Sequence, residues 1–249
     1  MKQLMLLALC TGMLTVAAVA QNATAKQDNE DLSLYRRALK YSDLSSAAFA
    51  LGRYLHKGGD STFQDTLALI YYNMNNLQGA YKLAGEINQQ NAKNVTALSL
   101  LADISGRAGE VKTSLDWYEK LVVLSPEAYN YYQLATKQFV LERNLECRQS
   151  LQKVIADSAA AKQQKVRLDV GEGYGEDVPV LAAAMNMLGA LAYKEKNTAL
   201  AEEWYTKAVA VFPDFVIAKQ NLDSLKKEAA GGKPQPAGKP APKPAVKKG

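Results

Sequence analysis

Few side chains in this sequence have the types and spacings that catalysis or metal binding needs. His56 is the only histidine among the 249 residues, so no pair of histidines can bind a metal. It is also the one candidate for an imidazole acid or base. His56 precedes Lys57-Gly58-Gly59, which indicates an ordinary solvated residue near a helix end.

Motifs for nucleophiles and phosphates are missing as well. The sequence has no Gly-x-Ser-x-Gly elbow and no Gly-Lys-Ser/Thr phosphate loop. The run Gly171-x-Gly173-x-Gly175 is not framed by the strand and helix start that a dinucleotide site requires. Acidic residues are spread along the chain, and no two are singled out. We therefore predict a protein that is not an enzyme and that has no metal and no cofactor.

The net charge of +5 comes from the two ends of the chain. Of the 30 basic residues, five are lysines in 231–249 and one is Lys2, which leaves 24 basic against 25 acidic residues in 21–230. A body so balanced does not indicate a basic face for specific nucleic-acid binding. Residues 230–249 are almost entirely Ala, Gly, Pro and Lys, so we expect a disordered tail.

The amino-terminal segment 1–20 has the pattern of an export signal. Lys2 precedes the apolar run from Leu4 to Val16, and Ala18-Val19-Ala20 offers the small residues of a cleavage site. The run is shorter than the about 20 residues of a membrane span. A lipoprotein signal at Cys10 is disfavoured because Leu9 is too large for that motif. We predict cleavage after Ala20, no transmembrane span in the mature chain, and a periplasmic or cell-envelope location.

The body shows the periodicity of helices. Apolar residues recur at three- and four-residue spacings, with short breaks of Asn, Gly, Asp or Pro, and almost no stretch alternates as a strand would. The predicted helices are 31–41, 43–57, 61–73, 77–90, 95–107, 111–124, 129–142, 145–157, 181–195, 198–211 and 214–228.

A repeated motif relates these helices to one another. Trp117-Tyr118-Glu119-Lys120 and Trp204-Tyr205-Thr206-Lys207 each precede a proline, and the interval between them is two periods of about 34 residues plus about 19 more. In 182–215, a glycine and two alanines allow close helix approach, a tyrosine fills the space beyond them, and a proline ends the second helix. These residues are Leu188-Gly189, Ala201, Tyr205, Ala208 and Pro213. The segment resembles a tetratricopeptide repeat (TPR).

The resemblance extends over about four-fifths of the chain. Units 95–128 and 61–94 match less closely than 182–215, and a further unit that contains Cys147 runs one residue early. Cys147 would occupy a small inward position, as a buried, inert thiol. The resemblance implies an all-α, right-handed TPR-like solenoid of about five helical hairpins plus a terminal capping helix, over residues 21–229.

The family implies a groove in which the first helices of successive hairpins bind a partner peptide. Its aromatic residues would suit apolar anchors of an extended or helical segment, although some could instead pack between repeats. The groove residues that the resemblance implies are Tyr72, Asn73, Asp103, Arg107, Tyr132, Phe139, Asn186, Tyr193 and Lys194. The lysine–asparagine clamp of some chaperone-binding relatives is not matched, because Asp65, Ser99 and Tyr132 stand at its positions.

Two segments are left for other roles. Three glycines and a proline predict an inserted loop at about 162–181, with an extended piece at Val166–Val170. The insertion is either a tolerated loop or a flap that contacts a partner through Tyr174. The sequence thus predicts a non-catalytic protein–protein interaction scaffold; the alternative is a factor held to the envelope or to a polyanion by weak contacts of its basic tail.

Overall fold

The computed structural model describes residues 30–171, 174–229 and 231. The predictions for the signal peptide and for the tail beyond Gly231 lie outside these residues. Internal contacts divide the chain after Leu100 into two units, and each is described by itself. No helix in the described ranges has the length and apolar composition needed to span a membrane.

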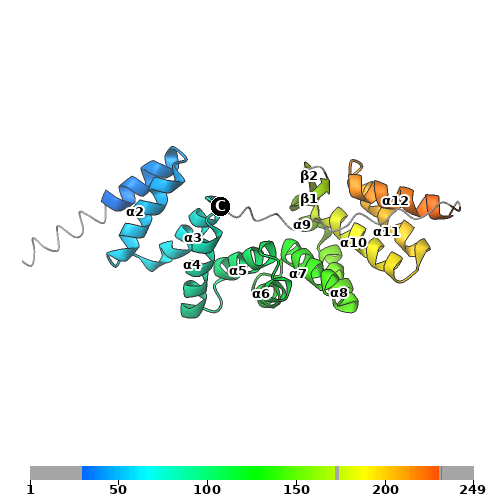
Figure 1. Cartoon of the computed structure of the whole chain (residues 1–249), viewed down its shortest axis with the longest axis horizontal. Coiled ribbons are helices and arrows are strands. Elements are labelled where there is room, and N and C mark those ends of the chain that lie inside the picture. The colour runs from blue at the N-terminus through cyan, green and yellow to red at the C-terminus, as the bar shows by residue number, and fades with distance from the viewer. Residues whose placement is uncertain (1–29, 172–173, 230, 232–249) are drawn as a thin grey trace, which may run out of the picture. The chain divides into compact units, whose positions relative to one another are not determined.

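The first unit consists of helices and one short 3₁₀ turn (Figure 1). Residues 30–40 are helical, and α2 (Leu44–His56), η1 (Ser61–Phe63), α3 (Gln64–Asn73), α4 (Leu77–Gln90) and the start of α5 (Val95–Arg107) follow. Asp43 and Asn76 cap α2 and α4 through their side chains. The core packs Tyr35, Leu51 and Ile70 from three successive helices, so each helix buries its apolar stripe on its neighbours.

The second unit continues the helical array and includes a small sheet. It contains the end of α5, α6 (Val111–Leu124), α7 (Ala128–Val140), α8 (Asn144–Ala156), α9 (Ser158–Gln163), β1 (Lys165–Gly171), β2 (Tyr174–Pro179), α10 (Val180–Lys194), α11 (Thr198–Val211) and α12 (Val216–Ala229). Every predicted helix is present, with ends that differ by at most three residues. The described residues thus hold five helix pairs followed by α12.

A left-handed residue marks the turn inside each helix pair. Positive φ angles occur at Ser42, Asn75, Gly109, Glu142 and Lys196. Each of these residues lies two positions before the first residue of the second helix of its pair. The first four positions recur at intervals of about 34 residues, whereas the interval from Glu142 to Lys196 is longer by about 20 residues. The backbone therefore repeats with the TPR period and shows one insertion, as the Trp-Tyr spacing predicted.

The pair α10 and α11 shows why glycine is needed in the repeat. A Cβ atom on Gly189 would lie 2.5 Å from Cε1 of Tyr205, so only glycine lets the tyrosine ring lie against the α10 backbone. Tyr205 is buried, and burial raises the pKa of its phenol well above the ordinary value. Ala201 and Ala208 are also fully buried on this side of α11, which allows close helix contact.

The Trp-Tyr-x-Lys motif has a structural explanation. Tyr118 and Tyr205 are buried, with 3% and 2% of their surfaces exposed, while the tryptophan before each is half-buried. The lysine three residues after each tryptophan covers its ring: Nζ lies 4.3 Å from the Trp117 ring centroid in the first copy and 4.5 Å from the Trp204 centroid in the second. The motif is an inward tyrosine beside an i,i+3 cation–π pair on the helix surface.

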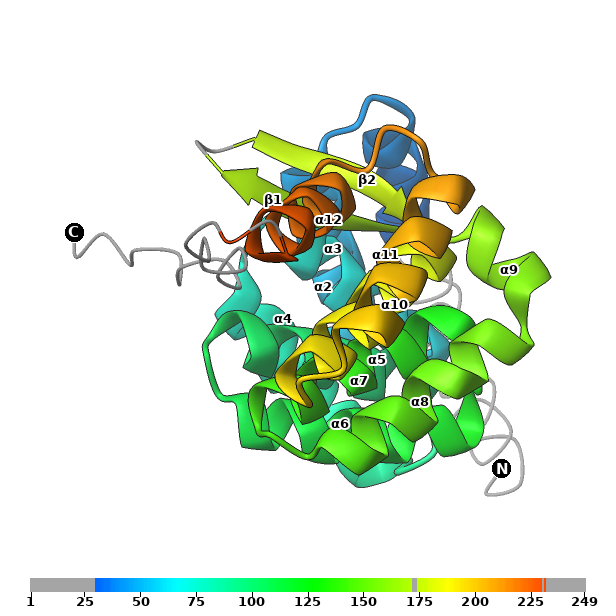
Figure 2. The same cartoon turned by 90° about the vertical axis from the view of Figure 1, so that its right-hand side faces the viewer.

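The prediction of an irregular loop at 162–181 is wrong in part. α9 ends at Gln163, and β1 and β2 then form an antiparallel hairpin that leads directly into α10 (Figure 2). The extended piece at Val166–Val170 is confirmed within β1. Val166 pairs with Val178, and both are buried in the core of the second unit. Burial of this pair favours a hairpin over a solvated loop.

The hairpin is fixed to the helix array at two points. The side-chain oxygen of Gln164 accepts a hydrogen bond of 2.8 Å from the backbone N–H of Tyr129, at the start of α7. Glu176 on β2 accepts one of 3.2 Å from the backbone N–H of Val216, at the start of α12. Both bonds use backbone donors that have no partner within their own helix. A carboxylate at a helix amino terminus is also favoured by the helix dipole.

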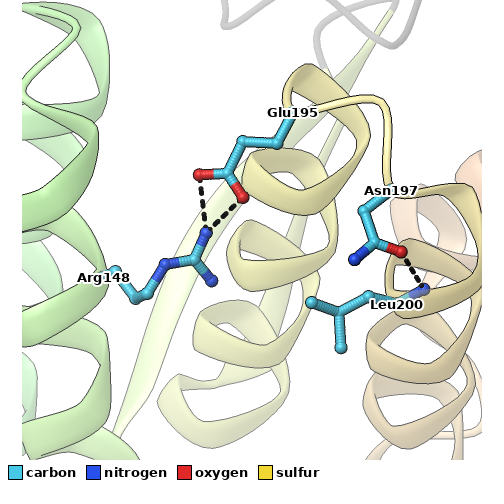
Figure 3. Close-up of polar contacts among 4 residues, drawn as sticks. All are labelled: Arg148, Glu195, Asn197 and Leu200. Carbon is cyan, nitrogen blue, oxygen red and sulfur yellow. Dashed lines mark hydrogen bonds and ion pairs between the residues drawn. The ribbon is translucent and has the colours of Figure 1, made fainter.

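Consecutive pairs in the second unit are joined by an ion pair (Figure 3). Arg148 on α8 donates from Nη2 to both carboxylate oxygens of Glu195, at distances of 2.7 and 2.6 Å. Glu195 is the residue that directly follows α10. Asn197 then caps α11 by accepting a hydrogen bond of 3.1 Å from the backbone N–H of Leu200. A cap of this type contributes about 1 kcal/mol, whereas an ion pair near the surface contributes about 1 kcal/mol or less.

Candidate protein-binding surface

Three helices of the second unit, α7, α10 and α12, bring aromatic and polar side chains into contact with one another. α10 contacts α7, and it is joined to α12 by side-chain hydrogen bonds. We call this surface the α7–α10–α12 face; its residues are Phe139, Asn186, Tyr193, Lys194, Asn221 and Glu228.

The ring of Phe139 and the ammonium of Lys194 come together on this face. Lys194 Nζ lies 5.4 Å from the centroid of the Phe139 ring and 3.2 Å from Oε1 of Glu142. Phe139 is half-buried, so part of its ring is accessible. The side chain of Glu142 is 78% exposed and that of Lys194 is 39% exposed, so this pair is weak and the carboxylate can be replaced by another. A partner with an apolar side chain and a carboxylate would cover the Phe139 ring and pair with the Lys194 ammonium.

Two hydrogen bonds hold polar groups of α10 against α12. Asn221 Nδ2 donates to Asn186 Oδ1 at 2.9 Å, and the Tyr193 hydroxyl donates to Glu228 Oε1 at 2.7 Å. The hydrogen bond to Glu228 is the main reason why the pKa of Tyr193 is raised, since it favours the protonated phenol. Tyr193 is half-buried with its ring held in place, which reduces the conformational entropy that a ligand contact would cost.

A second polar group lies where α5 meets α7. Burial lowers the pKa of Lys137, and the charge of Asp103 opposes that change. Burial also raises the pKa of Tyr129, and Asp103 raises it further. Lys137 lies over the ring of Tyr118, with Nζ 5.7 Å from its centroid. These residues form a charged, partly desolvated neighbourhood between α5 and α7.

The prediction that Tyr132 contacts a ligand is wrong. Tyr132 is 5% exposed and lies in the core with Cys147 and Leu151. Its pKa is raised, mainly by burial. The core around it also contains Ala161 of α9 and Val166 and Val178 of the hairpin, which belong to the insertion that the repeat pattern does not describe. Tyr129 takes the half-exposed position instead.

The other predicted site residues fall into three groups, two from the groove and one from the insertion. Tyr72 and Asn73 end α3 in the first unit, half-buried and exposed respectively. Asp103 is half-buried and Arg107 exposed on α5. Tyr174 starts β2 and is 71% exposed, near the tip of the hairpin. Of the predicted set, the structure places Phe139 against Lys194, and Asn186 and Tyr193 lie on the same helix as Lys194.

Sequence reasoning missed the contribution of α12, which was taken as a cap. Asn221 follows Asn186 by 35 residues, and Glu228 follows Tyr193 by the same interval. This spacing is within one residue of the repeat period, so each pair occupies equivalent positions on successive helices. The interval was therefore the signal that could have found both residues.

His56 and Cys147, the candidate acid–base and nucleophilic groups of the sequence, lie in surroundings that do not favour those roles. His56 is exposed at the end of α2, beside a shallow pocket whose other lining residues include Phe49, Arg53 and Tyr71 but no carboxylate. Cys147 is fully buried, its Sγ lies 4.0 Å from Sδ of Met187, and burial raises the pKa of the thiol to about 12. Within the described ranges, no cluster of three or more His, Cys, Asp and Glu could hold a metal ion.

The fold is that of the tetratricopeptide repeat proteins. A tetratricopeptide repeat protein from Parabacteroides merdae superposes with a TM-score of 0.62 at 18% identity, covering 83% of this chain and 74% of its own. MamA from Desulfovibrio magneticus, residue 41 to its end, gives 0.60 at 14% identity, covering 76% and 97%. PilF of Pseudomonas aeruginosa gives 0.53 at 16% identity, covering 68% of both chains. No family model and no curated protein matches the sequence.

Proposed function

We propose that this protein is a non-catalytic scaffold that binds a partner protein through the α7–α10–α12 face. The observation that carries the proposal is the arrangement on that face. Half-buried aromatic rings of Phe139 and Tyr193 stand beside amide and carboxylate groups that are already oriented by hydrogen bonds. Fixed aromatic anchors next to oriented polar groups are typical of surfaces that bind protein segments. The TPR fold supports the same class of function.

The chemistry of the face defines the partner segment. Apolar side chains would cover Phe139 and Tyr193, and a carboxylate would replace Glu142 beside Lys194. The Asn186–Asn221 pair offers amide donors and acceptors that suit a peptide backbone. We propose that the site of action is the periplasm or the cell envelope, which the signal-like residues 1–20 support.

Affinity capture with surface variants tests this proposal. The chain from Gln21 onward, with an affinity tag, is used to capture proteins from an extract of its own cell envelope. We expect the double variant Phe139→Ala/Tyr193→Ala to lose a partner that the unchanged chain retains, because both anchors are removed. The matched control is Val123→Ala/Leu145→Ala, which removes two apolar side chains that are 79% and 70% exposed elsewhere in the unit. Equal capture by all three proteins would contradict the proposal.

A second candidate function rests on the five lysines in 231–249, a segment without acidic residues. Such a tail would hold the protein to an anionic envelope polymer by weak, salt-sensitive contacts. Deletion of residues 231–249 distinguishes the two functions. If the tail is responsible, its deletion abolishes retention in the envelope fraction at low salt. If the α7–α10–α12 face is responsible, the deletion leaves partner capture unchanged.

A further inference from the structure

The hairpin inserted before α10 has one strand edge that is open to pairing. The sheet of the second unit has two strands, so each has one side without a neighbouring strand. Within the part of the chain that the structure describes, the backbone of β1 makes no hydrogen bond to main-chain groups outside the hairpin. Unpaired strand edges are templates for another strand.

The two edges of the hairpin differ in their chemistry. β2 contains Pro179, which has no N–H to donate, and the adjacent acids Glu176 and Asp177. Proline and like charges are the features that protect an edge from pairing. β1, in contrast, has the sequence Lys165-Val-Arg-Leu-Asp-Val-Gly171 without proline. The exposed edge that is not protected is therefore that of β1.

The sequence of β1 is complementary to itself in antiparallel orientation. When Leu168 of one copy faces Leu168 of another, Arg167 faces Asp169 twice, within the part of β1 that precedes its irregularity between Asp169 and Gly171. Arg167 and Asp169 are exposed on one side of the strand, whereas Leu168 and Val170 are half-buried on the other. Both sides of β1 thus match a second copy: opposite charges meet on the exposed side, and apolar residues meet on the side that adjoins the core.

The charged side chains are available for this pairing. Arg167 contacts Asp177 at 3.3 Å, but 67% of the arginine and 59% of the aspartate are exposed, so the pair is weak and the guanidinium can turn to another carboxylate. One oxygen of Asp169 accepts the N–H of Gly171 at 2.8 Å, and a carboxylate can accept more than one donor.

We infer that β1 pairs with β1 of a second copy of this chain, joining two hairpins into a four-stranded antiparallel sheet about a two-fold axis at Leu168. Such an interface is isologous, so each contact occurs twice. The dimer goes beyond the proposed partner-binding function and does not depend on it, because none of the residues of the α7–α10–α12 face belongs to β1.

Charge exchange tests the pairing directly. Sedimentation velocity of the chain from Gln21 onward, over a wide concentration range, measures its dissociation constant as a dimer. Arg167→Asp or Asp169→Arg places like charges opposite each other at two sites, and we expect either change to raise that constant about tenfold or more. The double variant Arg167→Asp/Asp169→Arg restores opposite charges and returns the constant close to the original value.

The matched control is Asp177→Asn, which removes the partner of Arg167 within the chain but leaves the edge unchanged. Its dissociation constant stays the same, and circular dichroism shows that all variants are folded. Hydrogen exchange of β1 amides slows as the protein concentration rises. The inference is overturned if the unchanged chain stays monomeric, if the double variant does not recover, or if the β1 amides are protected only by another protein from the envelope extract.

Discussion

Replacing Gly189 by alanine is expected to lower the free energy of unfolding of the second unit by about 2 kcal/mol. Helix propensity alone would favour alanine over glycine by up to about 1 kcal/mol. The added Cβ, however, would lie 2.5 Å from the ring of Tyr205, which is only 2% exposed. Overpacking therefore outweighs propensity. Both tryptophans, Trp117 and Trp204, belong to the second unit, so their fluorescence during denaturant unfolding measures its stability.

Gly85 provides the matched control for this substitution. It lies within α4, and a Cβ there would meet nothing within 4 Å. Gly85→Ala should therefore stabilise the first unit by up to about 1 kcal/mol, as helix propensity predicts, when unfolding is followed by circular dichroism. A Gly189→Ala variant that gains stability in the same way would show that Tyr205 does not pack against this glycine.

Replacing Tyr132 by alanine is expected to destabilise the second unit by about 4 kcal/mol, the cost of a large cavity in a packed core. Tyr132 is 5% exposed and contacts the core rather than solvent. Tyr193→Ala, on a half-buried tyrosine of the α7–α10–α12 face, should cost less stability but should weaken partner binding. Tryptophan fluorescence during unfolding measures the first effect, and affinity capture the second.

The contrast between the two tyrosines separates structural from binding roles. If Tyr132→Ala leaves unfolding unchanged yet abolishes capture, then Tyr132 is a surface residue and the assignment of the core is wrong. If Tyr193→Ala destabilises the unit as much as Tyr132→Ala does, then the hydrogen bond from Tyr193 to Glu228 and the packing of the Tyr193 ring stabilise the fold. The proposed binding role of Tyr193 would then be wrong.

The helices and their pairing could be predicted from sequence because the repeat imposes the same packing on each unit. The same close helix contact recurs in each repeat, so the period locates the small residues Gly189 and Ala201 and the large residue Tyr205. The turn residues could be placed for the same reason, although only Gly109 among them is a glycine. Local caps such as Asn76 and Asn197 then fix the helix starts.

The face could be predicted only in part because burial depends on neighbours that the repeat pattern does not describe. Tyr132 is buried in a core that also contains Ala161 of α9 and Val166 and Val178 of the hairpin, whereas Tyr129 is half-exposed, a difference that aromatic residue type alone does not reveal. The roles of Asn221 and Glu228 require knowledge that α12 continues the array as a further first helix, with its side chains bonded to α10.

The hairpin could not be predicted because β2 is a poor strand by its own sequence. Its residues Tyr-Gly-Glu-Asp-Val-Pro include types that strands disfavour, and its pairing depends on β1 and on the burial of Val178. Contacts outside the segment also support it, since Glu176 bonds the start of α12 and Gln164 bonds the start of α7. Tertiary contacts thus decide the structure of this insertion.

The central claim is that a partner binds the α7–α10–α12 face, and hydrogen exchange on the captured complex tests it most directly. We expect amides in α7, α10 and α12 to exchange more slowly in the complex than in the free chain, while amides of α8 and α11 remain unchanged. The side chains of the face project from those three helices, so a partner that covers them also shields their backbone. Protection confined to α8, α11 or the hairpin would contradict the account.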